Sequence, residues 1–383
     1  MFFKCSRLRS TLRYGLEARR ATENERVVEN RRRGRGAVSN ATGRFEPERR
    51  ELFDDGWNSF EELEPFKTEV REETVKRIIA WNDSPDLGFD RSVNPYRGCE
   101  HGCIYCYARP SHAYWGYSAG LDFETKLTAK INAAEALEQE LSKPSYKAAT
   151  LVLGSNTDAY QPIERERHIT RGVLEVLERF NHPVAIVTKS ALVVRDADIL
   201  ARMARKGLTK VAISVTTLDH RLARKMEPRA TTPGRRIEAI RQLAAAQIPV
   251  AVMAAPLIPA INDHELERIL EAGARAGASE AAFVLIRLPL EISPLFQEWL
   301  SANFPNRANR VMTLIRSTRG GKDYVSRFGE RQHGTGPYAE QIAARFRLAL
   351  AKFNLDRRRI ELRSGLFAKP GSGQLDLFSP HFS

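Results

Sequence analysis

The sequence has few cysteines and no long apolar run. Only four of its 383 residues are cysteine, too few for the disulfide framework of a secreted domain. No apolar segment approaches the roughly 20 residues that a membrane-spanning helix needs. We therefore expect a soluble protein in the reducing cytoplasm, with no membrane partner. With 42% hydrophobic residues, a chain of this length can still bury a substantial core.

The positive charge is not evenly distributed along the chain. The formal net charge is +13, but residues 1–50 carry 14 Lys and Arg against 6 Asp and Glu, and residues 307–369 carry 15 against 5. The stretch between them is slightly acidic. Basic ends of this kind predict a polyanionic partner, with nucleic acid as a candidate. A solvated tail is the alternative for residues 1–50, whose Arg-rich, acid-poor opening is also typical of transit peptides.

Short apolar runs that alternate with helical patterns dominate residues 148–287. Runs such as "ATLVLG", "PVAIVTKS" and "PVAVMAAP" are typical of parallel strands buried on both faces. Helical patterns follow at residues 165–180, 196–206, 233–246 and 263–276, and Asn262 followed by Glu265 predicts a capping box. A further strand near residues 92–96 brings the count to about six βα units. No G-x-G-x-x-G follows that strand, which disfavours a Rossmann-type sheet.

The sequence therefore predicts an α/β fold: a partial (βα)6 TIM-like barrel with a basic N-terminal arm and a C-terminal extension. We divide the chain into a basic, disordered arm at residues 1–50, a lead-in segment at 51–90, the barrel at 91–290 and a substrate or flap region at 291–383. Since six units are too few for a closed eight-fold barrel, the barrel should be open. Its active groups should lie at the C-terminal ends of the strands.

The C-terminal region combines cations, aromatic rings and glycines. Its segment "RSTRGGKDYVSRFGERQHGTGPYAEQIAARF" predicts a flexible flap over the barrel mouth, followed by a helix at residues 338–353. Arg316, Arg319 and Lys322 are candidates for contacts with phosphates, and the aromatic rings are candidates for stacking on an exposed base. An ordinary basic surface is the alternative.

Three of the four cysteines stand together in "NPYRGCEHGCIYCYARPSH". Cys99, Cys103 and Cys106 follow the first predicted strand, and the fourth, Cys5, is far away. Structural zinc needs four ligands, so His101 or His112 would have to complete such a site. Three thiolates on a [4Fe–4S] cluster instead leave one iron open to a ligand, which indicates chemistry. A zinc module and a plain electron carrier remain the alternatives.

The segment "CEHGCIYCY" resembles the C-x-x-x-C-x-x-C signature of the radical SAM superfamily, with Tyr105 just before the third cysteine. The longer "NPYRGCEHGCIYCYAR" is similar to the spore photoproduct lyase branch of that superfamily and to a related uncharacterised bacterial subfamily with an "RRRGRGAVSN"-like start. The resemblance covers about residues 94–287. It implies a [4Fe–4S] cluster whose open iron binds S-adenosylmethionine, and a reducing electron donor such as flavodoxin or ferredoxin. It also implies hydrogen abstraction by a 5′-deoxyadenosyl radical.

The same resemblance implies a set of cofactor-binding residues. Thr157 and Asp158 match the region that contacts the methionine moiety, and Lys189 is placed to meet its carboxylate. Ser214 lies where these enzymes bind ribose or carboxylate, and Tyr105 would reach adenine through its backbone. As an alternative, Thr157 and Asp158 are turn residues that cap the next helix. A buried hydroxyl such as that of Ser214 needs a partner, and a ligand would be one.

One departure separates this chain from the lyase. The lyase uses a further cysteine as a hydrogen-atom donor, and the matching position here is Ser155, with no cysteine after Cys106. A lyase reaction would then need Tyr105, Tyr107 or Tyr160 to return the hydrogen. In "KMEPRATTPG", which also resembles the lyase, Glu227 and Arg229 are expected either to contact the ligand or to pair with each other. The resemblance therefore implies the superfamily and leaves the reaction open.

Overall fold

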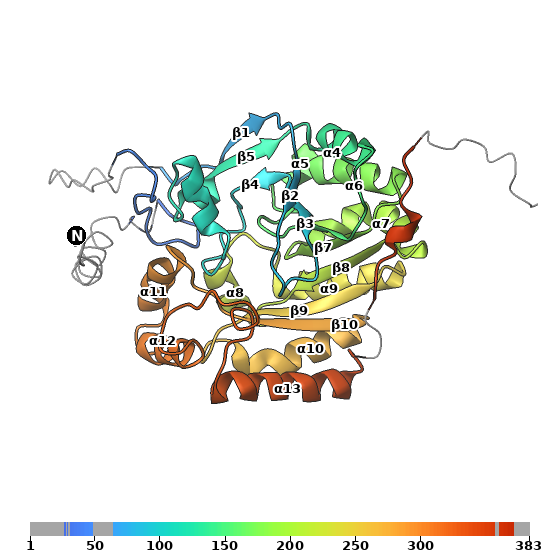
Figure 1. Cartoon of the computed structure of the whole chain (residues 1–383). Coiled ribbons are helices and arrows are strands. Elements are labelled where there is room, and N and C mark those ends of the chain that lie inside the picture. The colour runs from blue at the N-terminus through green and yellow to red at the C-terminus, as the bar shows by residue number, and fades with distance from the viewer. Residues whose placement is uncertain (1–26, 28, 30, 49–63, 357–359, 371–383) are drawn as a thin grey trace, which may run out of the picture.

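A seven-stranded sheet forms the centre of the molecule (Figure 1). The computed structural model describes residues 27, 29, 31–48, 64–356 and 360–370. The strand order is β10-β9-β8-β7-β6-β3-β2, and every neighbouring pair is parallel except β2 and β3. The bounds are β2 Ile79–Trp81, β3 Arg91–Val93, β6 Leu151–Leu153, β7 Val184–Thr188, β8 Thr209–Ser214, β9 Val250–Leu257 and β10 Glu280–Leu285. Six parallel strands with two separate edges make an open, partial barrel, as predicted.

Helices connect the parallel strands and cover the outer face of the sheet (Figure 1). The α-helices are α3 Asp122–Thr125, α4 Ala133–Ser142, α5 Glu164–Arg167, α6 Ile169–Arg179, α7 Ala197–Arg205, α8 His220–Met226, α9 Pro233–Ala245, α10 Leu266–Arg275, α11 Ile292–Asn303, α12 Ala308–Ser317 and α13 Pro337–Phe353. Four 3-10 helices are η1 Arg109–Trp115, η2 Ala191–Asp196, η3 Asp263–Glu265 and η4 Ser364–Leu366. No helix in the described ranges has the length and apolar character to cross a bilayer.

A second, three-stranded sheet lies beside the cysteine segment. Its order is β1 (Glu69–Glu73), β5 (Lys126–Lys130), β4 (Tyr96–Arg97), with β1 and β5 parallel and β4 antiparallel to β5. Strand β4 ends two residues before Cys99. The small sheet therefore anchors the start of the cysteine loop, residues 98–106.

The core consists mainly of the apolar strand runs that predicted the fold. Leu151, Val184, Val211 and Val250 are at most 2% exposed, because helices cover one face of the sheet and barrel residues fill the other. Burial of such side chains contributes about 1.5–3 kcal/mol each relative to exposure. The sheet is therefore a rigid support for the loops at its C-terminal edge.

Two local predictions differ from the structure. The helix expected at residues 165–180 is divided into α5 and α6 at His168, whose φ of 53° is left-handed. The capping box at Asn262 and Glu265 is wrong. Glu265 instead accepts hydrogen bonds from the Thr217 hydroxyl and the Leu218 amide, in the loop after β8. A long-range contact thus takes the carboxylate that the local pattern assigned to a helix start.

The N-terminal arm also differs from the prediction. Arg35, Ala37, Val38 and Ser39 are buried. Residues 35–39 therefore form a packed segment, here called the strap. The amides of Gly36 and Ala37 each donate to the Glu124 carboxylate at 2.8 Å. Figure 1 shows this blue segment beside the region that holds η1 and α3. The part of the arm before residue 27 lies outside the described residues, as does Cys5.

Candidate active site

The cysteine loop places three thiols at the C-terminal edge of the main sheet. Cys99 and Cys103 are each 7% exposed, Cys106 is half-buried, and none is in a disulfide. The loop turns at Gly98 and Gly102, whose φ values of +72° and +66° favour glycine. The three thiols thus lie in one loop, two of them buried and one half-buried.

Backbone contacts join the cysteine loop to elements far away in sequence. The Cys99 amide donates to the Phe123 carbonyl at 2.9 Å, and the Ile104 amide donates to the Met226 carbonyl at 2.9 Å. These bonds tie one side of the loop to α3 and the other to the end of α8. The position of the thiols therefore depends on both helices.

Burial dominates the electrostatics of the two inner thiols. Burial raises the pKa of Cys103 to about 12, although the nearby Lys189 charge opposes the rise. Burial also raises the pKa of Cys99, against a hydrogen bond from the Asp158 amide. Metal ligation deprotonates a thiol and supplies the missing positive charge. Two buried thiols and a half-buried one, with an amide donor to one sulfur, therefore fit an iron–sulfur cluster.

The two histidines considered as zinc ligands have other surroundings. The Nδ1 atom of His101 lies 3.4 Å from an Asp158 carboxylate oxygen. The ring of His112 packs between those of Tyr117 and Phe123, and burial lowers its pKa to about 4. Within the described ranges, no three His, Cys, Asp or Glu side chains are grouped to hold one metal ion.

A buried ion pair packs against the cysteine loop. Arg236 and Glu227 are 1% and 2% exposed, and their Nη2 and Oε1 atoms lie 2.6 Å apart. The other Glu227 oxygen accepts a hydrogen bond from the Tyr105 hydroxyl and lies 3.9 Å from the Cys103 sulfur. No sequence pattern pointed to Arg236. Of the two roles expected for Glu227 and Arg229, contact with the ligand or pairing with each other, the pairing is wrong, because Arg229 pairs with Glu100 at 3.0 Å. The Tyr105 side chain is therefore a structural link between the ion pair and the loop.

Asp158 organises the end of β7. Its carboxylate accepts hydrogen bonds from the Thr188 hydroxyl at 2.6 Å and the Lys189 amide at 2.8 Å. Burial alone would raise the pKa of Asp158, but His101 and these donors hold it well below its usual range. Its oxygens are thus occupied by the protein.

The remaining predicted residues lie around the same edge of the sheet. The Lys189 ammonium is 5.6 Å from the centre of the Tyr105 ring, close enough to Cys103 to affect its thiol. Ser214 is buried at the end of β8, and its hydroxyl has no hydrogen bond to another residue of the described chain. The Thr157 hydroxyl donates its hydrogen bond within the protein, to the Tyr96 carbonyl at 2.9 Å.

A tyrosine lies beside Ser155, the residue that the resemblance matches to the lyase's hydrogen donor. The Tyr107 hydroxyl donates to the Ser155 carbonyl, and the Arg287 guanidinium lies 5.1 Å from the centre of the Tyr107 ring. Tyr107 is 47% exposed, whereas Tyr160 is fully buried. Tyr107 is thus the tyrosine that stands next to the serine at the open side of the loop.

The strap and two charged residues complete the support of the cysteine loop. Glu124 and Arg109 are both fully buried, with an N–O distance of 2.5 Å, and Arg109 also donates to the Cys103 carbonyl at 2.9 Å. A Cβ atom added at Gly36 would lie 1.8 Å from the Gly102 carbonyl oxygen. The strap therefore packs directly on the cysteine loop, and only glycine fits at that contact.

Of the three cations expected to contact phosphates from the C-terminal region, Arg319 is engaged inside the protein, whereas Lys322 is exposed. Arg319 is 2% exposed and donates to the carbonyls of Ile286 and Glu330. Arg316 pairs with Asp323 at 2.7 Å. The segment is tied to the end of β10, where the Leu285 amide donates to the Gln332 carbonyl. Arg319 is therefore a structural residue, because its guanidinium is needed to hold the loop.

Known proteins match this fold and this loop. The model of the radical SAM superfamily matches residues 93–273. An uncharacterised protein of Mycobacterium tuberculosis (strain H37Rv) is 35% identical over 232 residues, which cover 60% of this chain and 68% of that one. The chain belongs to the radical SAM superfamily. It is thus an enzyme of a family that uses a [4Fe–4S] cluster and S-adenosylmethionine.

More distant radical SAM proteins match as well. The radical SAM Nα-GlyT isomerase of Pseudomonas phage M6 is 25% identical over 233 residues, 60% of this chain and 46% of that one. The structure of spore photoproduct lyase complexed with dinucleoside spore photoproduct has a TM-score of 0.52 and 16% identity, covering 74% of this chain and 79% of that one. At this identity the likeness establishes the shared fold alone.

Proposed function

We propose that Cys99, Cys103 and Cys106 hold three irons of a [4Fe–4S] cluster and that the fourth iron binds S-adenosylmethionine. The observation that carries this proposal is the set of three thiols, two buried and one half-buried, in one loop at the C-terminal sheet edge of a radical SAM fold. When bound, the cluster supplies one electron that cleaves S-adenosylmethionine and yields a 5′-deoxyadenosyl radical for hydrogen abstraction. A reducing cytoplasm and a donor such as flavodoxin or ferredoxin suit this chemistry.

The chain's own residues divide into contact and positioning groups. The Lys189 charge acts on the Cys103 thiol, and its ammonium lies 5.6 Å from the centre of the Tyr105 ring, so we assign it to the carboxylate of S-adenosylmethionine. Ser214 is a buried residue whose hydroxyl forms no hydrogen bond with the described residues, which suits a ribose or carboxylate oxygen. Asp158 and the Thr157 hydroxyl, already bonded within the protein, position the loops around β7 and β4. Thr157 and Tyr105 would then meet the cofactor through their backbones.

The substrate we propose is a nucleic acid. Two features support it: the strongly basic chain and the fold shared with a lyase complexed with a dinucleoside photoproduct. Repair of a thymine photoproduct itself is expected to be weak, because the hydrogen-donor position is Ser155 and the sequence has no cysteine after Cys106. The reaction on the nucleic acid therefore differs from that of the lyase.

Removing any one thiol tests the cluster. Anaerobically reconstituted protein should bind about four irons and four sulfides, and Cys99→Ala, Cys103→Ala or Cys106→Ala should each abolish this, because three thiolates are the minimum that holds the cluster with one open iron. Iron and sulfide analysis measures the result. Cys5→Ala is the control and should retain the cluster. Stoichiometric zinc in place of iron would contradict the proposal.

Binding of S-adenosylmethionine is expected to weaken when the side chains proposed to contact it are truncated to alanine. Lys189→Ala and Ser214→Ala should each raise the dissociation constant about tenfold, since a hydrogen bond to a charged group contributes about 1.5–3 kcal/mol. Equilibrium binding to the reconstituted variants, with iron content as a check, measures the effect. Thr231→Ala, at a hydroxyl bonded to the Ala191 amide, is a control outside the site. Wild-type affinity in both variants would show that these residues are not the contacts.

A further inference from the structure

We propose that the surface around α8 binds the phosphates of a nucleic-acid strand, away from the reacting nucleotide. This inference rests on the proposed substrate class and gives it a location. The α8 surface consists of six cations that border helix α8: Arg32, Arg221, Arg224, Lys225, Arg268 and Arg307. Five of them are exposed, and Arg32 is half-buried.

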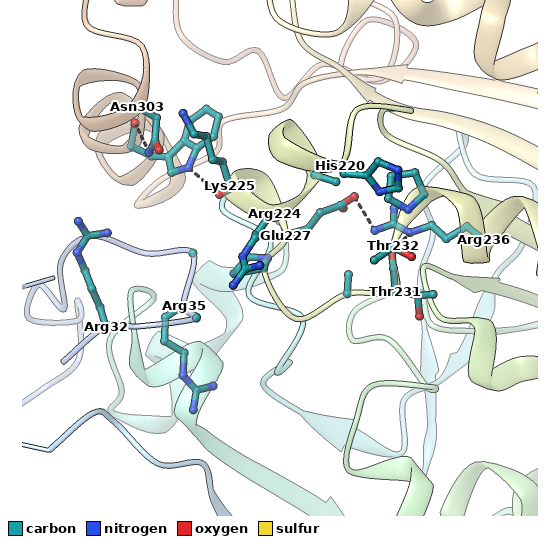
Figure 2. Close-up of a pocket in the computed structure, with 17 residues that line it drawn as sticks. Arg32, Arg35, His220, Arg224, Lys225, Glu227, Thr231, Thr232, Arg236 and Asn303 are labelled. Atoms are coloured by element: carbon teal, nitrogen blue, oxygen red, sulfur yellow. Dashed lines mark hydrogen bonds and ion pairs between the residues drawn. The ribbon is translucent and has the colours of Figure 1, made fainter. Parts of the chain in front are cut away.

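Two cavities flank α8 and share Lys225. The first, of about 400 Å³, is also lined by Arg32 and Arg224 (Figure 2). The second, of about 460 Å³, is lined by Arg221, Arg268 and Arg307. The cations therefore line hollows rather than a flat surface, and such hollows can enclose phosphate groups.

These cations lack the carboxylate partners that other arginines of the chain have. On neighbouring helices, Arg171 pairs with Asp198, Arg202 with Glu178 and Arg345 with Glu267. Within the part of the chain that the structure describes, none of the six cations of the α8 surface forms an ion pair. Unpaired positive charge concentrated in a hollow attracts an anion from outside the protein.

The acidic residues that line the two cavities are already engaged. Glu227 pairs with Arg236, as Figure 2 shows, and Glu265 accepts hydrogen bonds from Thr217 and Leu218. Asp219 accepts bonds from the amides at the start of α8. They cannot turn to the six cations without giving up these bonds. The cavities thus present a net positive charge.

The position of the α8 surface indicates a long ligand. Helix α8 follows β8 at the active edge of the sheet, and its Met226 carbonyl accepts a bond from Ile104 in the cysteine loop. Neither cavity is lined by Lys189, Ser214 or Cys106. A ligand bound at α8 is therefore close to the reaction site but not in it. Binding energy from such remote groups serves to orient the reacting part of a substrate.

A strand of nucleic acid meets these requirements in one molecule. It carries a phosphate at every nucleotide, so several of the six cations can be neutralised while a neighbouring base reaches the barrel mouth. Each neutralised phosphate releases counterions and makes affinity depend on salt. The alternative ligand for a basic surface beside the cysteine loop is an acidic reductant protein, and the experiment separates the two.

The test is binding of a labelled single-stranded oligonucleotide, DNA or RNA, to the full chain without S-adenosylmethionine. The double variant Arg221→Glu/Arg224→Glu should weaken binding at least about tenfold, and the slope of log K against log salt should fall by about 1.4, at about 0.7 for each lost phosphate contact. The control Arg347→Glu/Lys352→Glu changes the same charge on exposed positions of α13 and should stay within about twofold of wild type. Circular dichroism and iron content verify that both variants fold.

Wild-type affinity and an unchanged salt slope in the α8 variant would overturn the proposal. A second result would also overturn it: the α8 variant no longer binds reduced flavodoxin but still binds the oligonucleotide. The surface would then serve the electron donor. The measurement uses no S-adenosylmethionine and is independent of radical chemistry. Failure of the proposed function would instead appear as no 5′-deoxyadenosine from the reduced, reconstituted wild type.

Discussion

Replacing Glu124 by alanine is expected to destabilise the protein by about 3–5 kcal/mol and to release the strap from the cysteine loop. The fully buried Glu124 carboxylate accepts bonds from the Gly36 and Ala37 amides and pairs with Arg109. Alanine would leave the equally buried Arg109 charge without its carboxylate. Since Arg109 also holds the Cys103 carbonyl, iron content after reconstitution should fall as well. Urea denaturation of the iron-free protein measures the free energy of unfolding.

Two variants separate the buried charge from packing of the strap. Glu178→Ala removes a carboxylate that pairs with Arg202 at 24% and 45% side-chain exposure, and should cost no more than about 1 kcal/mol. Gly36→Ala keeps every charge but drives a Cβ atom into the Gly102 carbonyl, so it should also displace the strap. Gly34→Ala is its control, because nothing lies within 4 Å of that Cβ position. A loss in Glu124→Ala no larger than in Glu178→Ala would refute this account.

Glu227→Ala is expected to have a similarly large effect, a loss of about 3–5 kcal/mol in the free energy of unfolding. Arg236, buried at 1% exposure, would keep its charge while losing the carboxylate 2.6 Å away. Its two remaining bonds, to the Thr231 and Ser214 carbonyls, cannot neutralise a cation. Tyr105 would lose its hydrogen-bond acceptor in the same variant. Chemical denaturation of the iron-free protein again provides the measurement.

The control for Glu227 lies on the same helix as Arg236. Glu238 pairs with Arg241 on α9 at 45% and 59% side-chain exposure, so Glu238→Ala should cost under about 1 kcal/mol. The double variant Glu227→Leu/Arg236→Met should recover much of the stability, because replacing a buried ion pair by apolar residues is often neutral. If the double variant is as unstable as Glu227→Ala, the loss comes from packing and not from the unpaired charge.

The sequence by itself determined the architecture and the three thiols. Strands buried on both faces leave near-continuous apolar runs, such as "LVL" in β6, and the helices between them keep a 3.6-residue period. These patterns report short-range geometry, so βα units could be recognised without coordinates. The cysteines are close in sequence, and one turn of backbone suffices to bring them together.

Only the tertiary structure decided what supports the thiols and which cations are free. Glu124 meets the strap across 87 and 88 residues of sequence, and Glu227 lies 124 residues from Cys103. Arg319 and Arg224 look alike in the sequence, yet one is buried among carbonyls and the other is exposed beside a cavity. The physical reason is that a local pattern fixes the direction of a side chain on its own element. The partner of that side chain, and therefore its role, depends on which distant parts of the chain pack against it in the folded protein.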